Sequence, residues 1–259
     1  ILKGFCVLAL VSAALIAREP VRTRKAMVVA QEPIAVDVGV EVLKAGGNAV
    51  DAAVAVAFAL AVTHPSAGNI GGGGFLLARF ADGRSTFIDF REMAPASASR
   101  NMYIGKDGKP TRQSVVGWRA AGVPGTVRGL EMAHKKYGRK GWAELVGPSV
   151  KLAAEGVTLS YAEARSMCGA KKLMGQFVES NRIFLKGGAC FEAGERLVQP
   201  ELARVLERIA RLGASDFYEG QTARMLAAEM KNNGGEITAE DLKGYKAVER
   251  QPLKGTHRG

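Results

Sequence analysis

A single arginine, Arg91, stands where an apolar stretch ends, and its side chain could bind a carboxylate. The five residues before it, 86–90, alternate in the manner of a strand, so Arg91 emerges at the end of that strand. A planar guanidinium donates two parallel hydrogen bonds to a carboxylate, which an ammonium group cannot do. The same arginine could instead pair with Asp89 or Glu92. The pattern alone leaves two interpretations, a substrate anchor and a simple ion pair.

Four consecutive glycines, 71–74, precede the first strand of a predicted hairpin. A phosphate-binding glycine loop leads into a helix, whose free N–H groups meet the anion. These glycines lead instead into residues 75–80, which have the composition of a strand, and no Lys-Ser or Lys-Thr pair follows them. We therefore predict that they allow close backbone approach, either to the alanine-rich helix before them or to an active site in a partner.

The sequence shows no complete set of catalytic side chains. His64 directly follows an apolar helix and is predicted to lie at its end, and Thr126 is predicted to begin a helix. The pair at 256–257 resembles a processed N-terminal threonine with its neighbour, but it lies in a polar tail. Three scattered histidines and the two isolated cysteines that follow the apolar stretch at 1–17 cannot complete a metal site, so we predict neither metal nor cofactor. Candidate serine nucleophiles do not stand out either, because Ser66, Ser114 and Ser149 lie in no G-x-S-x-G context.

The composition suits one large globular domain or two small ones, with 259 residues of which 47% are hydrophobic. The net charge of +11 could favour nucleic acid or a membrane surface. The basic groups at 18–25, 135–140 and 171–172 are scattered, however, and no repeated alternation of aromatic and basic residues marks a platform for single-stranded nucleic acid. We interpret them as a solvated surface or a surface that meets an acidic partner chain, and predict no binding of nucleic acid.

Residues 1–17 are apolar, with Lys3 near the start and small residues at the end. This pattern predicts a secretory signal, with an uncleaved anchor as the alternative. We therefore expect a periplasmic or extracellular protein. Such a compartment allows a disulfide between Cys168 and Cys190, although two positions do not determine whether it forms.

Glycines and caps divide the rest of the chain into predicted elements. A helix over 34–45 ends at a glycine pair, and Asn48 caps an almost wholly apolar helix over 49–62, which must be buried on all sides. A hairpin joins strands 75–80 and 85–90. Thr238 begins a short helix with a capping box. The remaining predictions are strands at 27–30 and 244–249 and helices at 125–137, 142–155, 161–173, 200–212 and 221–232.

Four long segments, in this order, resemble the large subunit of a bacterial γ-glutamyltranspeptidase. The resemblance runs from about residue 26 to residue 259, which we take as the large-subunit region. It implies an α+β fold of the Ntn-hydrolase type, a four-layer αββα sandwich that is incomplete in this chain. We also expect the chain to continue into, or to pair with, a further segment, because the polar tail after residue 250 leaves a sheet edge unpaired. The segments are NAVDAAVAVAFALAVTHPSAGNIGGGGFLLARF, IDFREMAPASASRNMY, AGVPGTVRGLEMAHKKYG and FYEGQTARMLAAEMKNNGGEITAEDLKGYKAVERQPL.

The resemblance also implies a chemistry. In this family a precursor cuts itself, and the new N-terminal threonine of the small subunit attacks the γ-glutamyl amide of glutathione or a related donor. The γ-glutamyl group then passes to water, an amino acid or a dipeptide. Arg91 matches the arginine that binds the α-carboxylate of the donor, and Glu92 beside it could orient the guanidinium. No catalytic nucleophile lies in this chain.

Three functions remain open on this scaffold. The first is γ-glutamyl transfer and hydrolysis, in a heterodimer with the small subunit of the same precursor. The second is the activity of a relative that acts on poly-γ-glutamate or on cephalosporin side chains. The third is a non-catalytic extracytoplasmic binding protein that keeps the scaffold. The first predicts self-cleavage and turnover of small γ-glutamyl donors.

Overall fold

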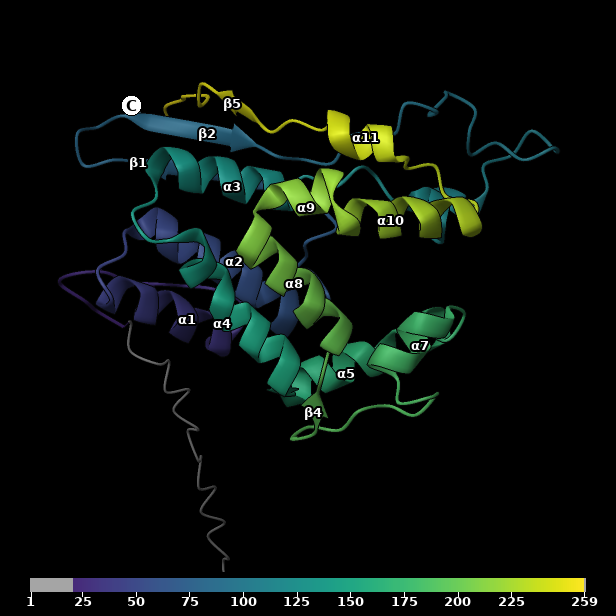
Figure 1. The fold of residues 1–259 in the computed structure, drawn as a ribbon, viewed down its shortest axis with the longest axis horizontal. Coiled ribbons are helices and arrows are strands. Elements are labelled where there is room, and N and C mark those ends of the chain that lie inside the picture. The colour runs from purple at the N-terminus through teal and green to yellow at the C-terminus, as the bar shows by residue number, and fades with distance from the viewer. Residues whose placement is uncertain (1–20, 259) are drawn as a thin grey trace, which may run out of the picture.

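The apolar helix α2 (Ala49–Thr63) forms the centre of the helical part of the molecule. The computed structural model describes residues 21–258, so the expected signal at 1–17 lies outside the described residues. Helix α2 packs against α1 (Pro33–Lys44) and α4 (Trp142–Glu155) (Figure 1). The Phe58 ring of α2 is fully buried and meets the Trp142 ring edge-on, with 5.5 Å between ring centroids. The small alanine side chains of α2 allow neighbouring helices to pack closely against it.

The N-terminus of α2 is fixed by a buried carboxylate. Asn48 and Asp51 form a capping box, in which the Asn48 side chain accepts from the N–H of Val50 and of Asp51. Asp51 is fully buried, and its carboxylate accepts from the backbone N–H of Arg139 at 2.9 Å and of Lys140 at 3.3 Å. The cap of α2 is therefore also the bond that holds the loop before α4.

A three-stranded antiparallel sheet lies along one side of the helices (Figure 1). Its order is β1 (Phe75–Arg79), β2 (Ser85–Asp89), β5 (Val248–Arg250), and the register pairs Leu76 with Ile88 and Ile88 with Glu249. One face is buried against helices including α3 (Thr126–Tyr137). The sheet therefore joins a local hairpin to a strand from the far end of the chain.

The other face of the sheet is largely exposed and carries an apolar patch. Phe75 and Leu77 of β1 are 53% and 68% exposed. The Phe75 ring stacks on Phe87 of β2, with 5.4 Å between centroids. We call Phe75, Leu77 and Phe87 the outer sheet face. Period-two alternation explains the asymmetry, because every second side chain points away from the helices.

Strand β5 is attached to the helical layer through Glu249. Its carboxylate accepts from the Thr86 hydroxyl of β2 and from the Lys136 ammonium and Tyr137 hydroxyl of α3. These three bonds, with the Lys136 bond largest, lower the pKa of Glu249 to about 2. The carboxylate therefore stays ionised well below neutral pH.

Replacing this carboxylate should remove a contribution to stability that depends on pH. The pKa of Glu249 is lower in the folded than in the unfolded state, so its contribution is fully present above its ordinary pKa of 4.5 and is lost as pH falls towards 2. We expect Glu249→Gln to lower the free energy of unfolding by about 1–2 kcal/mol at pH 7. The effect is this small because the Lys136–Glu249 pair is partly exposed, so solvent screens the interaction. Urea unfolding of the full-length protein at pH 7 and at pH 2 to 3 measures the difference.

The matched control for Glu249 is Glu179→Gln, which removes an exposed pair with Arg182 within one helix. This control should change stability by less than about 0.5 kcal/mol at either pH. If Glu249→Gln lowered the free energy of unfolding equally at both pH values, the lowered pKa of Glu249 could not be the source of its contribution.

The remaining helices complete the helical part of the molecule (Figure 1). Trp142 of α4 donates its indole N–H to the Ile209 carbonyl of α8 at 2.8 Å. A disulfide joins Cys168 to Cys190, so the pairing that the sequence left open is formed. The further elements are α5 (Tyr161–Gly169), α6 (Lys171–Met174), α7 (Val178–Phe184), α8 (Pro200–Leu212), α9 (Ala214–Glu219), α10 (Gln221–Asn232), α11 (Ala239–Gly244), two short helices (Arg112–Ser114 and Trp118–Ala120), and the paired strands β3 (Val157–Thr158) and β4 (Arg196–Leu197).

Three sequence predictions about elements are wrong. Residues 27–30 form no strand within the described part of the chain. The helix predicted over 161–173 is interrupted at Ala170, where the chain passes from α5 to α6. The strand predicted over 244–249 begins only at Val248, because α11 continues to Gly244. The residues next to each of these segments carry no signal that would have predicted the observed boundaries.

Candidate functional site

Arg91 lies two residues beyond the end of β2, on an exposed part of the surface. Its side chain is 68% exposed, and its Nε lies 3.3 Å from a carboxylate oxygen of Glu92. The ion pair considered from the sequence is thus formed with Glu92, whereas the Asp89 carboxylate accepts from Arg250 at 2.9 Å. Within residues 21–258 the two terminal nitrogens of Arg91 make no hydrogen bond. They can therefore bind both oxygens of a carboxylate while Glu92 holds the Nε.

The backbone of Arg91 is held from both sides. Its N–H donates to the Asp89 carboxylate at 3.1 Å, and its carbonyl accepts from the Tyr245 hydroxyl at 2.8 Å. The Arg91 N–H, followed by Arg250, lowers the pKa of Asp89. Tyr245 belongs to a segment far along the chain, and no local sequence signal marks it as a neighbour of Arg91.

The glycines before β1 run against the backbone around Arg91. A Cβ on Gly73 would lie 2.5 Å from the Phe90 carbonyl oxygen and 2.7 Å from the Glu92 nitrogen. The carbonyl of Gly72 accepts from the N–H of Gly125 at 2.7 Å. Close backbone approach is therefore confirmed, but the segment approached is the end of β2 and the start of α3 rather than helix α2. At position 73 any side chain would collide with the backbone of Phe90 and Glu92, so only glycine fits there.

The other side chains considered for catalysis serve structure or lie apart from Arg91. Thr126 is the first residue of α3, as predicted, and its hydroxyl donates to the Asn69 side chain at 2.7 Å. His64 caps the C-terminus of α2, with its Nε2 3.3 Å from the Ser66 hydroxyl. Ser149 is buried inside α4. The described residues thus bring no base to a nucleophile beside Arg91.

Among residues 21–258, no three histidine, cysteine or acidic side chains group closely enough to hold a metal ion. No helix in the same range is both long enough and apolar enough to cross a bilayer.

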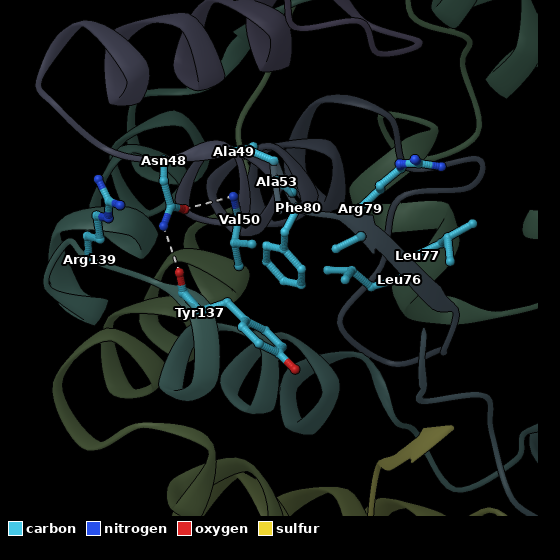
Figure 2. A pocket seen from close by; sticks show the side chains of 12 residues that line it. Asn48, Ala49, Val50, Ala53, Leu76, Leu77, Arg79, Phe80, Tyr137 and Arg139 are labelled. Carbon is cyan, nitrogen blue, oxygen red and sulfur yellow. Dashed lines mark hydrogen bonds between the residues drawn. The ribbon is translucent and has the colours of Figure 1, made fainter. Parts of the chain in front are cut away.

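The pocket in Figure 2 lies beside the open edge of β1 and not at Arg91. It has a volume of about 440 Å³ and is mostly apolar. One of its polar side chains, that of Asn48, already accepts from the Val50 N–H and donates to the Tyr137 carbonyl, as the dashed lines show. A second cavity, of about 280 Å³, is lined by Met93, Val123, Asp241 and Tyr245, on the side of the molecule near Arg91.

Comparisons with known proteins agree with the resemblance read from the sequence. Residues 35–259 match the family model for gamma-glutamyltranspeptidase. The chain is 48% identical over 242 residues to the glutathione hydrolase proenzyme of Escherichia coli, covering 93% of this chain and 42% of that protein. The chain thus spans about two fifths of the length of the curated relatives it matches.

Solved structures show the same likeness in three dimensions. The gamma-glutamyltranspeptidase of Helicobacter pylori superposes with a TM-score of 0.91 at 44% identity, over 93% of this chain and 70% of that one. A cephalosporin acylase from Bacillus halodurans gives a TM-score of 0.80 at 27% identity, over 93% and 47%. The expected α+β Ntn-hydrolase class is confirmed, with one three-stranded sheet and its helices contributed by the described residues. The chain belongs to the gamma-glutamyltranspeptidase family.

Proposed function

We propose that this chain is the large-subunit portion of a proenzyme that hydrolyses glutathione and transfers γ-glutamyl groups. The observation that supports it most is the 48% identity to a glutathione hydrolase proenzyme across nearly the whole chain. Identity to the cephalosporin acylase is lower, at 27%. Because the chain spans only part of those relatives, the reactive threonine is assigned to a segment that follows it.

In this proposal Arg91 binds the α-carboxylate of the γ-glutamyl donor. Its two terminal nitrogens donate to the two carboxylate oxygens, which fixes the donor at the end far from its γ-carbonyl. The threonine hydroxyl adds to that carbonyl and gives its proton to the threonine's own α-amine. The C–N bond then breaks, the amine of the leaving group takes the proton, and water or an acceptor amine later releases the γ-glutamyl group.

The outer sheet face is where we place the small subunit. Phe75 and Leu77 are more than half exposed, although they lie in a regular strand beside the stacked ring of Phe87. An apolar face of this kind needs a cover, and β1 has one unpaired edge. A small subunit that adds sheet here would build the second layer of the expected sandwich and bring its threonine to the side of β2 that carries Arg91.

We place the protein outside the cytoplasm, in the periplasm or the extracellular space. The disulfide between Cys168 and Cys190 supports this location, because such bonds persist in oxidising compartments. The apolar residues 1–17 support it as an export signal. Pulse-labelling of the precursor in intact cells, followed by fractionation, tests both statements together.

The decisive experiment expresses the complete precursor and follows its cleavage and its activity. We expect two fragments on a denaturing gel, hydrolysis of glutathione, and transfer to an amino acid or dipeptide such as glycylglycine. Cleavage with activity only on poly-γ-glutamate or on acyl-cephalosporins would replace this function by that of the corresponding relative. Absence of both cleavage and turnover would leave a binding protein. The control replaces the N-terminal threonine of the small subunit by alanine and should abolish both signals.

A further inference from the structure

The carbonyl of Arg91 is oriented by one side chain from the other end of the chain. Tyr245 follows α11, and its hydroxyl donates to the Arg91 carbonyl at 2.8 Å across 154 residues of sequence. The Arg91 N–H is fixed separately, by the Asp89 carboxylate at 3.1 Å. Both peptide groups of the arginine are therefore bonded, and together they set the direction in which its Cβ leaves the backbone.

This orientation is not supplied by the sheet itself. The ladder between β1 and β2 ends at the pair Phe75–Asp89, and the last backbone bonds beyond it join Phe90 to Gly74. Arg91 lies one residue further, where no strand continues. Without the Tyr245 hydroxyl, no other described group donates to its carbonyl.

Tyr245 is itself held rigidly. It is 3% exposed, and its ring stacks on Tyr218 with 5.8 Å between centroids and 16° between planes. Its hydroxyl occupies the space above Gly125, where a Cβ would lie 2.1 Å from it. Burial, followed by the charges of Asp89 and Glu92, raises the pKa of Tyr245 to about 12. The phenol therefore remains a donor at every pH at which the protein would work.

We propose that Tyr245 is a positioning residue for carboxylate recognition, acting through the main chain of Arg91. The proposal rests on the proposed function, since Arg91 must bind the donor for its placement to matter. A two-point contact tolerates errors of only about 0.5 Å, so loss of the carbonyl bond should weaken it without removing it. Tyr245 lies behind Arg91 and need not touch the donor.

The kinetic signature follows from this geometry. The α-carboxylate is bound in the ground state and in the transition state alike, so a weaker contact raises KM and leaves kcat nearly unchanged. For Tyr245→Phe in the full-length, self-cleaved protein we expect KM for glutathione to rise about 3- to 10-fold and kcat to stay within about 2-fold. The ring and its stack on Tyr218 are kept, so folding and self-cleavage should persist.

A double-mutant cycle with Arg91→Lys separates positioning from general loss of structure. If Tyr245 acts only through the arginine, adding Tyr245→Phe to Arg91→Lys should raise KM by less than about 2-fold more. The matched control is Tyr103→Phe, which removes a tyrosine hydroxyl bonded to the Arg119 carbonyl at 3.0 Å. This control should leave KM unchanged, and thermal unfolding of all variants reports their stability.

The outcomes distinguish the two proposals. A wild-type protein that turns over no γ-glutamyl donor would overturn the proposed function and this inference with it. If the wild type is active, an unchanged KM for Tyr245→Phe, a fall in kcat at constant KM, or full additivity with Arg91→Lys would overturn the positioning role alone.

Discussion

Replacing Arg91 by lysine should raise KM for glutathione by about 10- to 100-fold in the complete, self-cleaved protein, with kcat reduced by no more than a few fold. Lysine keeps the positive charge but replaces two parallel hydrogen bonds by one adjustable contact. Charge-assisted hydrogen bonds are worth about 1.5–3 kcal/mol, and each 1.4 kcal/mol is a factor of ten. The Nε bond to Glu92 is lost as well, so the new ammonium is no longer held in place. Initial-rate kinetics with glutathione measure the effect.

A matched control for Arg91 lies in the turn between β1 and β2. Arg84 is an exposed arginine that pairs with Asp82 at 2.7 Å, and Arg84→Lys should leave both kinetic constants unchanged. Self-cleavage of the Arg91 variant should also proceed, since the arginine has no part in forming the threonine. A KM for the Arg91 variant equal to that of the wild type would remove this residue from the donor site and leave its pair with Glu92 as a surface feature.

Replacing Asp51 by alanine should lower the free energy of unfolding by about 3–5 kcal/mol. Its carboxylate is fully buried and accepts from three backbone N–H groups, those of Asn48, Arg139 and Lys140. Each buried donor left without a partner costs about 1–3 kcal/mol, and the cap of α2 is weakened at the same time. Water can reach the loop before α4 and bond some of the three N–H groups. The expected loss of stability is therefore smaller than the sum of three full costs.

Two further variants test the reason for the Asp51 effect. Asp51→Asn keeps one acceptor oxygen and should cost about half as much as alanine. Asp37→Ala removes an exposed carboxylate from α1 and should change stability by less than about 0.5 kcal/mol. Urea unfolding of the full-length protein gives all three values. A loss below 1 kcal/mol for Asp51→Ala would show that the carboxylate is not what holds α2 to the loop.

Local patterns predicted most of the regular elements. The helix at 142–155 and the strands of the hairpin were found because apolar periodicity, a turn glycine and glycine stops all lie within a few residues of one another. The capping boxes at Asn48 and Thr238 are equally local. Strand β5 was misplaced by several residues because its position depends on pairing with β2 and on the bonds of Glu249 to Thr86, Lys136 and Tyr137. These partners are distant in sequence, so no nearby residue indicates them.

Arg91 could be chosen from the sequence as a candidate site residue, but the groups around it could not. A lone arginine after an apolar strand pointed to carboxylate chemistry, and the resemblance selected that interpretation over an ion pair. The structure shows that Glu92 contacts the Nε of Arg91, while the terminal nitrogens make no hydrogen bond within residues 21–258. One arginine can therefore form the ion pair and also bind a carboxylate. The bond from Tyr245 connects residues 154 positions apart, and such contacts have no signature in a single sequence.

The wide sequence separation of these contacts bears on how the protein matures. The hairpin can close as soon as its two strands leave the ribosome, because its pairing is local. The Tyr245 and Arg250 bonds, across 154 and 161 residues, can form only after the intervening helices have been synthesised. Newly made chains therefore fix the direction of the Arg91 side chain only after the segment that carries Tyr245 has been synthesised, well after the hairpin before Arg91 has closed.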